Sequence, residues 1–290
     1  MRMRAQLAAR AFGVVTALAL FAPLFGCASG ATEQPTRALN VAVSILPQKY
    51  FVERVGGEHV TVNVMVLPGE SPATYEPSPA QLRALSGADA YFSIGVPFEN
   101  AWLDRITSAN DEMVMVDTTE GIERIEEGGN PDPHIWLSPS QVRIQAATIA
   151  EALAGADPAH AEVYEANLTA LLEDIDVLDA EIRETLVGVE ERRFMVFHPS
   201  WQYFAQDYGL EMIAIEVGGQ EPSAAELARL IDTAKEEGIE VIFAQPEFST
   251  EAAETIAGEI GGQVLLISPL AEDWLDNLRR VTETFAQHLG

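Results

Sequence analysis

The chain has 290 residues, which is enough for one large domain or two medium lobes. Hydrophobic residues make up 48% of it, and this content supplies a packed core and argues against disorder. Asp and Glu number 45 against 17 Lys and Arg, so the formal net charge is -28. Nucleic acids need concentrated basic side chains, so this charge argues against a nucleic-acid partner and suits a cation as cargo.

The first 26 residues have the order of an export signal. Arginines precede an apolar stretch at residues 11–25, which is too short for a comfortable transmembrane span. The sequence Leu-Phe-Gly-Cys at residues 24–27 resembles a bacterial lipobox, whose cysteine is lipidated and becomes the new N-terminus. We therefore expect a lipoprotein signal peptide, a lipid anchor on Cys27 and a flexible tether over residues 27–38. A buried free cysteine in an ordinary signal or membrane anchor is the alternative.

From residue 39 onward, short runs rich in Val, Ile, Met and Phe alternate with longer helical patterns. The predicted strands lie at residues 39–45, 60–67, 90–94, 113–117, 194–197, 211–216, 241–244 and 264–267. The predicted helices lie at residues 48–55, 79–86, 99–107, 139–153, 201–208, 223–237, 250–260 and 271–288. Strands that alternate with helices predict parallel sheets that are covered on both faces.

One long helix is predicted at residues 157–188, where Asp157 can cap the helix and Pro158 can open it. Apolar side chains recur there three or four residues apart, at Tyr164, Leu168, Leu171, Ile175, Leu178, Ile182 and Leu186. We expect an α/β fold with two lobes, residues 39–156 and residues 189–290, each on a mainly parallel sheet and joined by this helix. A coiled-coil dimerisation helix is the competing interpretation, but a single apolar stripe between compact halves favours packing along both lobes of a monomer.

Two of the five histidines follow features that typically place ligands. His134 lies between prolines just ahead of a predicted helix, and His198 directly follows the strand predicted at residues 194–197. Ligands of open α/β sheets bind beyond the carboxyl ends of strands. Imidazoles from two lobes could therefore hold a metal ion between them. A lone histidine is more often structural, and we interpret three in that way: His59, His160 and His288.

Carboxylates near the ends of predicted strands are further candidates for metal ligands. Glu247 follows a predicted strand, and Glu70 lies in the proline-rich loop at residues 68–79. Either could also be an ordinary loop or capping residue, because acidic side chains are common in this chain. The acidic stretch at residues 120–132, which ends at Asp132, is interpreted as a solvated face, with the gathering of cations as a lesser alternative.

Signatures of enzymes are missing from the sequence. It contains no phosphate-binding glycine loop, no Gly-x-Ser-x-Gly motif and no His-Glu-x-x-His motif. A metallohydrolase is disfavoured because no general base is recognisable beside the histidines. We therefore expect a binding protein rather than an enzyme.

Several short motifs together resemble one protein family. They are Ser44-Ile45-Leu46-Pro47, Pro68-Gly69 with Tyr75-Glu76-Pro77, Gly95-Val96-Pro97-Phe98-Glu99, Asp132-Pro133-His134-Ile135-Trp136-Leu137, His198-Pro199, Tyr208-Gly209-Leu210, Gln245-Pro246 and Pro269-Leu270. From about residue 40 to its end, the chain resembles the zinc/manganese class of ABC-transporter solute-binding lipoproteins, which carry two lobes on one backbone helix. The resemblance implies one divalent cation held between the lobes and delivered to an ABC permease.

The resemblance also implies a metal site with four ligand positions, of which two match. His134 and His198 stand where the family has ligands. The histidine that is common in the first loop is replaced by Ala73, and the aspartate that is common after the last strand is replaced by Ser268. Neither side chain supplies the charge or the affinity of the ligand it replaces.

These departures leave two interpretations. In the first, Glu247 or Glu70 replaces a lost ligand and water completes the shell, which suits zinc or the harder manganese ion. In the second, the metal site is degenerate and the protein serves surface adhesion or another interaction on the same fold. We favour the first, because both histidines and their proline-framed loops are retained. The expected protein is the binding component of a metal importer, extracytoplasmic and either lipid-anchored to the cell membrane or periplasmic, with zinc as the cargo and manganese as the alternative.

Overall fold

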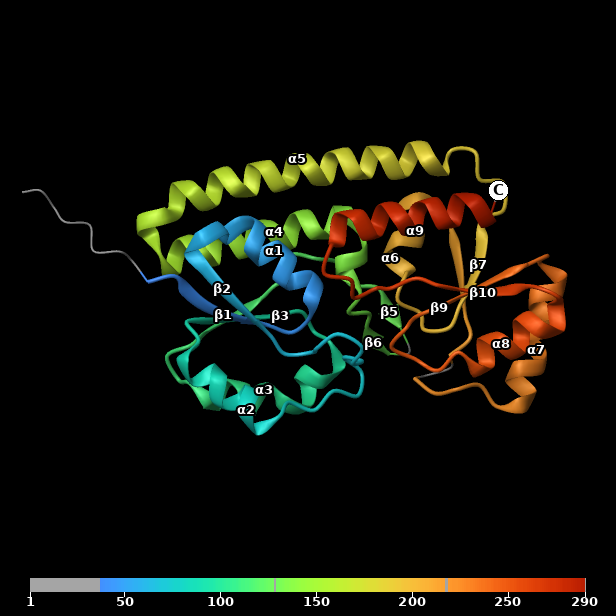
Figure 1. The fold of residues 1–290 in the computed structure, drawn as a ribbon, viewed down its shortest axis with the longest axis horizontal. Helices are drawn as coiled ribbons and strands as arrows, with labels where there is room; N and C mark the ends of the chain where they lie inside the picture. Colours follow the sequence, from blue (N-terminus) through green and yellow to red (C-terminus); the bar gives the residue numbers. More distant parts are fainter. Residues whose placement is uncertain (1–36, 128, 217–218, 290) are drawn as a thin grey trace, which may run out of the picture. The chain divides into compact units, whose positions relative to one another are not determined.

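The computed structural model describes residues 37–127, 129–216 and 219–289. The predicted signal peptide, the predicted lipid attachment at Cys27 and almost all of the predicted tether lie outside the described residues. Strands and helices alternate along the described chain (Figure 1). In these ranges no helix is both long enough and apolar enough to cross a membrane.

The N-terminal lobe is built on a four-stranded parallel sheet with the order β2-β1-β3-β4. Its strands are β1 (Leu39–Val43), β2 (Val60–Val64), β3 (Ala90–Ser93) and β4 (Val114–Asp117). Its helices are α1 (Leu46–Gly56), α2 (Pro79–Ala84), α3 (Pro97–Ala109) and α4 (Pro139–Ala156). Helices α1 and α4 lie on one side of the sheet, and α2 and α3 lie on the other (Figure 1). The central strand β1 is therefore apolar on both faces, with Val41, Ala42 and Val43 fully buried.

The C-terminal lobe repeats this plan with a second parallel sheet, in the order β10-β9-β7-β8. Its strands are β7 (Arg193–Val196), β8 (Glu211–Ala214), β9 (Val241–Ala244) and β10 (Gln263–Leu266). Its helices are α6 (Gln202–Tyr208), α7 (Ala224–Glu236), α8 (Glu251–Ile260) and α9 (Trp274–His288). A short antiparallel hairpin of β5 (Glu126–Glu127) and β6 (Asn130–Pro131) precedes the 3-10 turn η3 (Ile135–Leu137).

A long helix connects the two lobes. A 3-10 turn at Pro158–His160 leads into α5 (Ala161–Leu186), whose 26 residues correspond to about 39 Å of helix. Helix α5 packs against α1 and α4 of the first lobe and against α9 of the second (Figure 1). The predicted apolar stripe accounts for this packing, and its buried members are Tyr164, Leu171, Ile175, Leu178, Ile182 and Leu186. Because the stripe is covered within the chain, it leaves no seam that needs a coiled-coil partner.

One hydrophobic core cluster extends through both lobes. The ring of Phe51 from α1 meets the indole of Trp274 from α9 edge to face, with their centroids 5.1 Å apart. This aromatic contact, together with α5, joins the lobes through packed side chains rather than through flexible strands alone. The predicted fold class, two α/β lobes with parallel sheets joined by one long helix, is confirmed.

Candidate metal site

The backbone around each of the two candidate histidines is fixed by hydrogen bonds. His134 immediately precedes η3, and its backbone N–H donates to Oδ1 of Asp132 at 2.9 Å. His198 follows β7, and its backbone N–H donates to Oε1 of Gln245 at 3.1 Å. The amide Nε2 of Gln245 donates in return to the carbonyl of His198 at 2.8 Å. Neither imidazole therefore sits on a loosely held loop.

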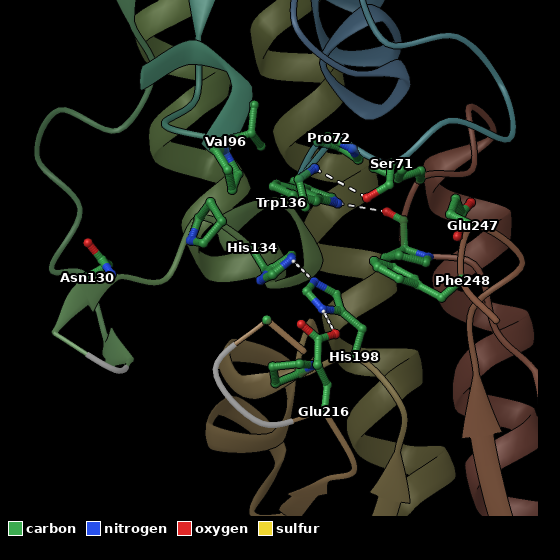
Figure 2. Close-up of a pocket in the computed structure, with 17 residues that line it drawn as sticks. Ser71, Pro72, Val96, Asn130, His134, Trp136, His198, Glu216, Glu247 and Phe248 are labelled. Atoms are coloured by element: carbon green, nitrogen blue, oxygen red, sulfur yellow. Dashed lines mark hydrogen bonds and ion pairs between the residues drawn. The ribbon is translucent and has the colours of Figure 1, made fainter. Parts of the chain in front are cut away.

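The two imidazole rings face each other across the gap between the lobes. The Nε2 atom of His134 lies 3.2 Å from the Nε2 atom of His198 (Figure 2). The rings are nearly perpendicular, at 73°, and their centroids are 5.1 Å apart. Residues that lie 64 positions apart in the sequence thus bring two nitrogen donors to one point.

A carboxylate lies behind each ring. Nδ1 of His134 lies 2.7 Å from Oδ1 of Asp132, and Nδ1 of His198 lies 2.8 Å from Oε2 of Glu216. A carboxylate accepts a proton donor, so each pair favours the tautomer with the proton on Nδ1. In that tautomer both Nε2 lone pairs point into the gap. Two acceptors cannot share a 3.2 Å contact favourably unless a cation or a proton lies between them.

The roles of these two carboxylates differ from the sequence-based expectation. Asp132 ends the acidic stretch that we interpreted as a solvated face, and for this residue the interpretation is wrong because the side chain is 1% exposed. One carboxylate oxygen accepts from both the backbone N–H and the ring of His134, and the other is buried without a hydrogen-bond partner among the described residues. Glu216 was not among the predicted site residues. Its only signal in the sequence is its position at the end of a predicted strand that neighbours the strand before His198.

The carboxyl ends of all four strands of the C-terminal sheet point toward this region. His198 follows β7, Glu216 follows β8, Glu247 follows β9 and Ser268 follows β10. The carboxyl ends of parallel strands meet at one edge, so polar side chains that directly follow them gather there. The sheet topology thus explains why residues spread over 71 positions of sequence lie near one site.

A cavity of about 460 Å³ surrounds the paired histidines. Its walls are largely apolar, with prolines 72, 97, 133 and 199, Val96 and Leu270 among the lining residues. Trp136 and Phe248 supply aromatic walls, and the ring of Phe248 stacks on His198 with centroids 4.6 Å apart. An apolar cavity with a few convergent polar groups is typical of a small-ligand site.

Glu247 also lines this cavity (Figure 2). Its Oε2 atom is buried and has no hydrogen-bond partner among the described residues. Burial raises the pKa of the Glu247 carboxyl, and its own backbone N–H, the hydroxyl of Ser268 and the charge of His198 oppose this rise only in part. A buried carboxylate oxygen that has no hydrogen-bond partner among the described residues and lies near the two histidines could bind a cation.

The remaining candidate positions, Glu70, Ala73 and Ser268, place no metal-binding atom in the gap between the two imidazoles. Glu70 is exposed and does not line the cavity; its carboxylate accepts the backbone N–H of Leu67 at 3.2 Å. Ala73 lines the cavity without offering a donor atom, and the hydroxyl of Ser268 accepts the N–H of Leu270 at 3.2 Å. Within the described part of the chain, no group of three or more His, Cys, Asp or Glu residues is arranged to hold a metal ion. Among the residues that the structure describes, only the two imidazoles converge in this conformation.

Comparisons with known proteins identify the family and the fold. The sequence-family model ZnuA, described as "Zinc-uptake complex component A periplasmic", matches residues 41–288. A crystal structure of ZnuA superposes with a TM-score of 0.86 at 49% sequence identity, covering 87% of this chain and 100% of that one. The matched residues include both histidines, the long helix and both sheets except the first two residues of β1.

Two further relatives show the range of described activities. The manganese-binding lipoprotein MntA of Halalkalibacterium halodurans is 28% identical over 292 residues, covering 96% of this chain and 97% of that protein. The laminin-binding protein Lmb of Streptococcus agalactiae, described as bifunctional with adhesin and metal-transporting activity, has a TM-score of 0.81 at 25% identity over 88% of this chain and 100% of that one. The family match over nearly the whole described chain, on the two-lobed fold with facing histidines, shows that this chain belongs to the ZnuA family of zinc-uptake components.

Proposed function

We propose that this chain is the extracytoplasmic binding component of an ABC importer for a divalent metal ion, with zinc as its cargo. His134 and His198 bind the ion through their Nε2 atoms, one from each lobe. The observation that carries the proposal is the 3.2 Å separation of these atoms, each on a ring whose other nitrogen is paired with a carboxylate. That arrangement is typical of histidines that ligate a metal.

The separation fits tetrahedral coordination. Zinc binds imidazole nitrogens at about 2.0–2.1 Å, so two nitrogens on adjacent corners of a tetrahedron lie about 3.3 Å apart. The Nε2 atoms are 3.2 Å apart, so an ion can bind both with little movement of either ring. Imidazole nitrogen suits zinc better than it suits manganese, which prefers oxygen ligands, and this chemistry favours zinc.

Electrostatics also support a divalent cation. Asp132 and Glu216 pair with the far sides of the two rings, and Glu247 lines the same cavity. A cation bound between the rings gains attraction from these partly desolvated carboxylates, where screening by water and salt is weak. Glu247 is the carboxylate that we assign as a ligand from the C-terminal lobe.

The proposed partner of the chain is an ABC permease, and its proposed location is the outer surface of the cell membrane. A binding component of this kind releases its ion to an ABC permease, acts as a monomer without catalytic activity and is held at the membrane by a lipid on Cys27. Surface adhesion is the second hypothesis from the sequence, and the Lmb relative is described as having both activities. The two retained carboxylate–histidine pairs favour metal binding, because adhesion alone has no need of them.

Uptake by cells tests the proposed function. Radiolabelled zinc uptake is measured in cells that lack the gene and carry either the wild-type chain or a His134→Ala, His198→Ala double variant. We expect the wild type to restore uptake at submicromolar zinc and the double variant to fail at equal protein levels. Equal uptake by both strains would exclude the histidine pair as the cargo site.

A further inference from the structure

We propose that the cavity binds zinc as a complex with a small amine-bearing chelator, an α-amino acid that supplies the donor atoms that the described residues do not bring to the ion. The inference rests on the proposed function and names the chemical form of its cargo. It follows from four properties of the cavity: its donor set, its size, the charges on its walls and its aromatic surfaces.

The donor set of the chain is incomplete for a closed zinc site. Two imidazoles converge, and no third His, Cys, Asp or Glu joins them among the described residues. A structural zinc site has four ligands, so two corners remain if the ion binds in the observed conformation. A rotation of Glu247 into the gap would still leave one. A bidentate molecule, with one amine nitrogen and one carboxylate oxygen, fills both corners in the observed conformation. When Glu247 also binds, as the proposed function assigns, the ion becomes five-coordinate, a geometry that zinc also adopts.

The cavity is larger than an ion with two waters requires. Water occupies about 30 Å³ per molecule in the liquid, so two waters account for about 60 Å³. The cavity measures about 460 Å³, within the range of pockets that bind small organic molecules. The lining of the cavity is largely apolar and includes Pro72, Val96 and Leu270. A hydrated ion buries no apolar surface against such walls. A ligand with a hydrocarbon portion does, and this burial stabilises its binding.

The charges on the walls select the kind of chelator. Among the described residues, those that line the cavity include the carboxylates of Glu216 and Glu247 and no lysine or arginine. A polycarboxylate such as citrate would be repelled there, because no cation offsets its charge beyond the metal. An amine that is bound to zinc keeps N–H donors, and the unpartnered Oε2 atom of Glu247 is a buried acceptor for one.

The aromatic walls indicate which amino acid is the best probe. Trp136 and Phe248 both line the cavity, and Phe248 already stacks on the ring of His198. Trp136 is 1% exposed, so the partly exposed ring of Phe248 is the accessible aromatic surface. A second imidazole, carried by free L-histidine, can stack on Phe248 while its amine and carboxylate bind the ion. L-histidine is therefore the ligand chosen for the test.

Equilibrium dialysis with radiolabelled L-histidine and zinc tests the inference on the full chain, with free zinc held constant by a metal buffer. We expect one equivalent of label and one of zinc to be retained together, and no label to be retained without zinc. Zinc retained without label would overturn the inference and leave the proposed function intact. Retention of the label without zinc would also overturn the inference. If neither the label nor zinc is retained, both the inference and the proposed function are overturned.

Two matched variants locate the bound label. Ala73 is exposed and lines the cavity, so Ala73→Leu takes up ligand space without disturbing the core. Ala101 is equally exposed on α3 and does not line the cavity, so Ala101→Leu is the control. We expect Ala73→Leu to lower label retention about tenfold or more while zinc is still bound, and Ala101→Leu to retain both. Equal label retention by the two variants would place the amino acid elsewhere and contradict the inference.

Discussion

The indole of Trp274 donates a hydrogen bond to the backbone carbonyl of Trp136 at 2.6 Å. The indole of Trp136 in turn donates to the carbonyl of Pro269 at 2.7 Å. Trp136 lies two residues after His134, while Trp274 is the first residue of α9 and Pro269 lies five residues before it. These paired bonds connect the loop that carries His134 to the C-terminal lobe, so they help to fix the distance between the two halves of the proposed metal site.

Replacing Trp274 by Phe should lower the stability of the protein. The substitution leaves the buried carbonyl of Trp136 without its donor, at a cost of about 1–3 kcal/mol in the free energy of unfolding. Urea unfolding followed by circular dichroism measures the loss. Trp102→Phe is the control, since Trp102 is half-buried on α3 and its indole lies against Arg105 rather than at the junction. A loss no larger than that of the control would show that the bond does not stabilise the junction.

The carboxylates behind the rings should control metal affinity without touching the ion. Asp132→Asn or Glu216→Gln removes the charge that favours the proton on Nδ1, and such changes lower metal affinity about 10- to 100-fold. Zinc competition with a fluorescent chelator measures the effect. Glu123→Gln, at an exposed position, is the control and should bind zinc like the wild type. Wild-type affinity in both test variants would rule out this role.

The burial of Asp132 shows where sequence reasoning fell short. The sequence places Asp132 at the end of a run of acids, where charge patterning predicts solvent exposure. The structure buries it because a short turn brings its carboxylate back to the backbone and ring of His134. Periodicity and charge do not encode such a turn, and the spacing Asp-x-His was its only local signal.

The long helix and the position of His198 could be predicted because local sequence patterns and tertiary contacts favour the same structure. The stripe from Tyr164 to Leu186 predicted the long helix, and all of its residues except the half-buried Leu168 are buried. The position of His198 after a strand predicted its place at the sheet edge. The sequence could not show that Nε2 of His134 would lie 3.2 Å from it, since that distance depends on the packing of two lobes. Glu70 illustrates the same limit, because its loop position was predicted but its outward direction was not.

Replacing Glu247 by Gln should lower the zinc affinity of the protein without lowering its stability. Burial raises the pKa of its carboxyl, so the metal-free folded state binds that proton more tightly than the unfolded state does. Stability from this group is present below the unfolded pKa and is lost as pH rises through the folded pKa. At neutral pH, Glu247→Gln should therefore leave the metal-free protein as stable or more stable, and should weaken zinc binding about tenfold. Urea unfolding and zinc competition are the two measurements; a marked loss of stability together with unchanged affinity would contradict the assignment.

Glu99 should contribute to the pH dependence of stability. Its carboxylate is 3% exposed and accepts hydrogen bonds from the hydroxyl of Ser44 and from the N–H groups of Ile94 and Gly95. Burial nevertheless raises the pKa of Glu99. Because the folded pKa exceeds the unfolded one, its contribution is full at low pH and declines as pH rises through the folded pKa.

The Glu99→Gln variant tests that sign. As the pH rises from about 5 to about 8, we expect the free energy of unfolding of the variant to increase relative to that of the wild type. Urea unfolding at several pH values, compared with the exposed substitution Glu123→Gln, measures the difference. A difference that stays constant or reverses with pH would show that Glu99 does not titrate in this way.

Isothermal titration of zinc into the purified protein, beside the single variants His134→Ala and His198→Ala, tests the central claim most directly. We predict one site in the wild type with a micromolar or lower dissociation constant, and a loss of about 100-fold or more in each variant, because each removes one of the two converging nitrogens. Zinc binding of wild-type strength in either variant would contradict the claim that the two imidazoles share one ion.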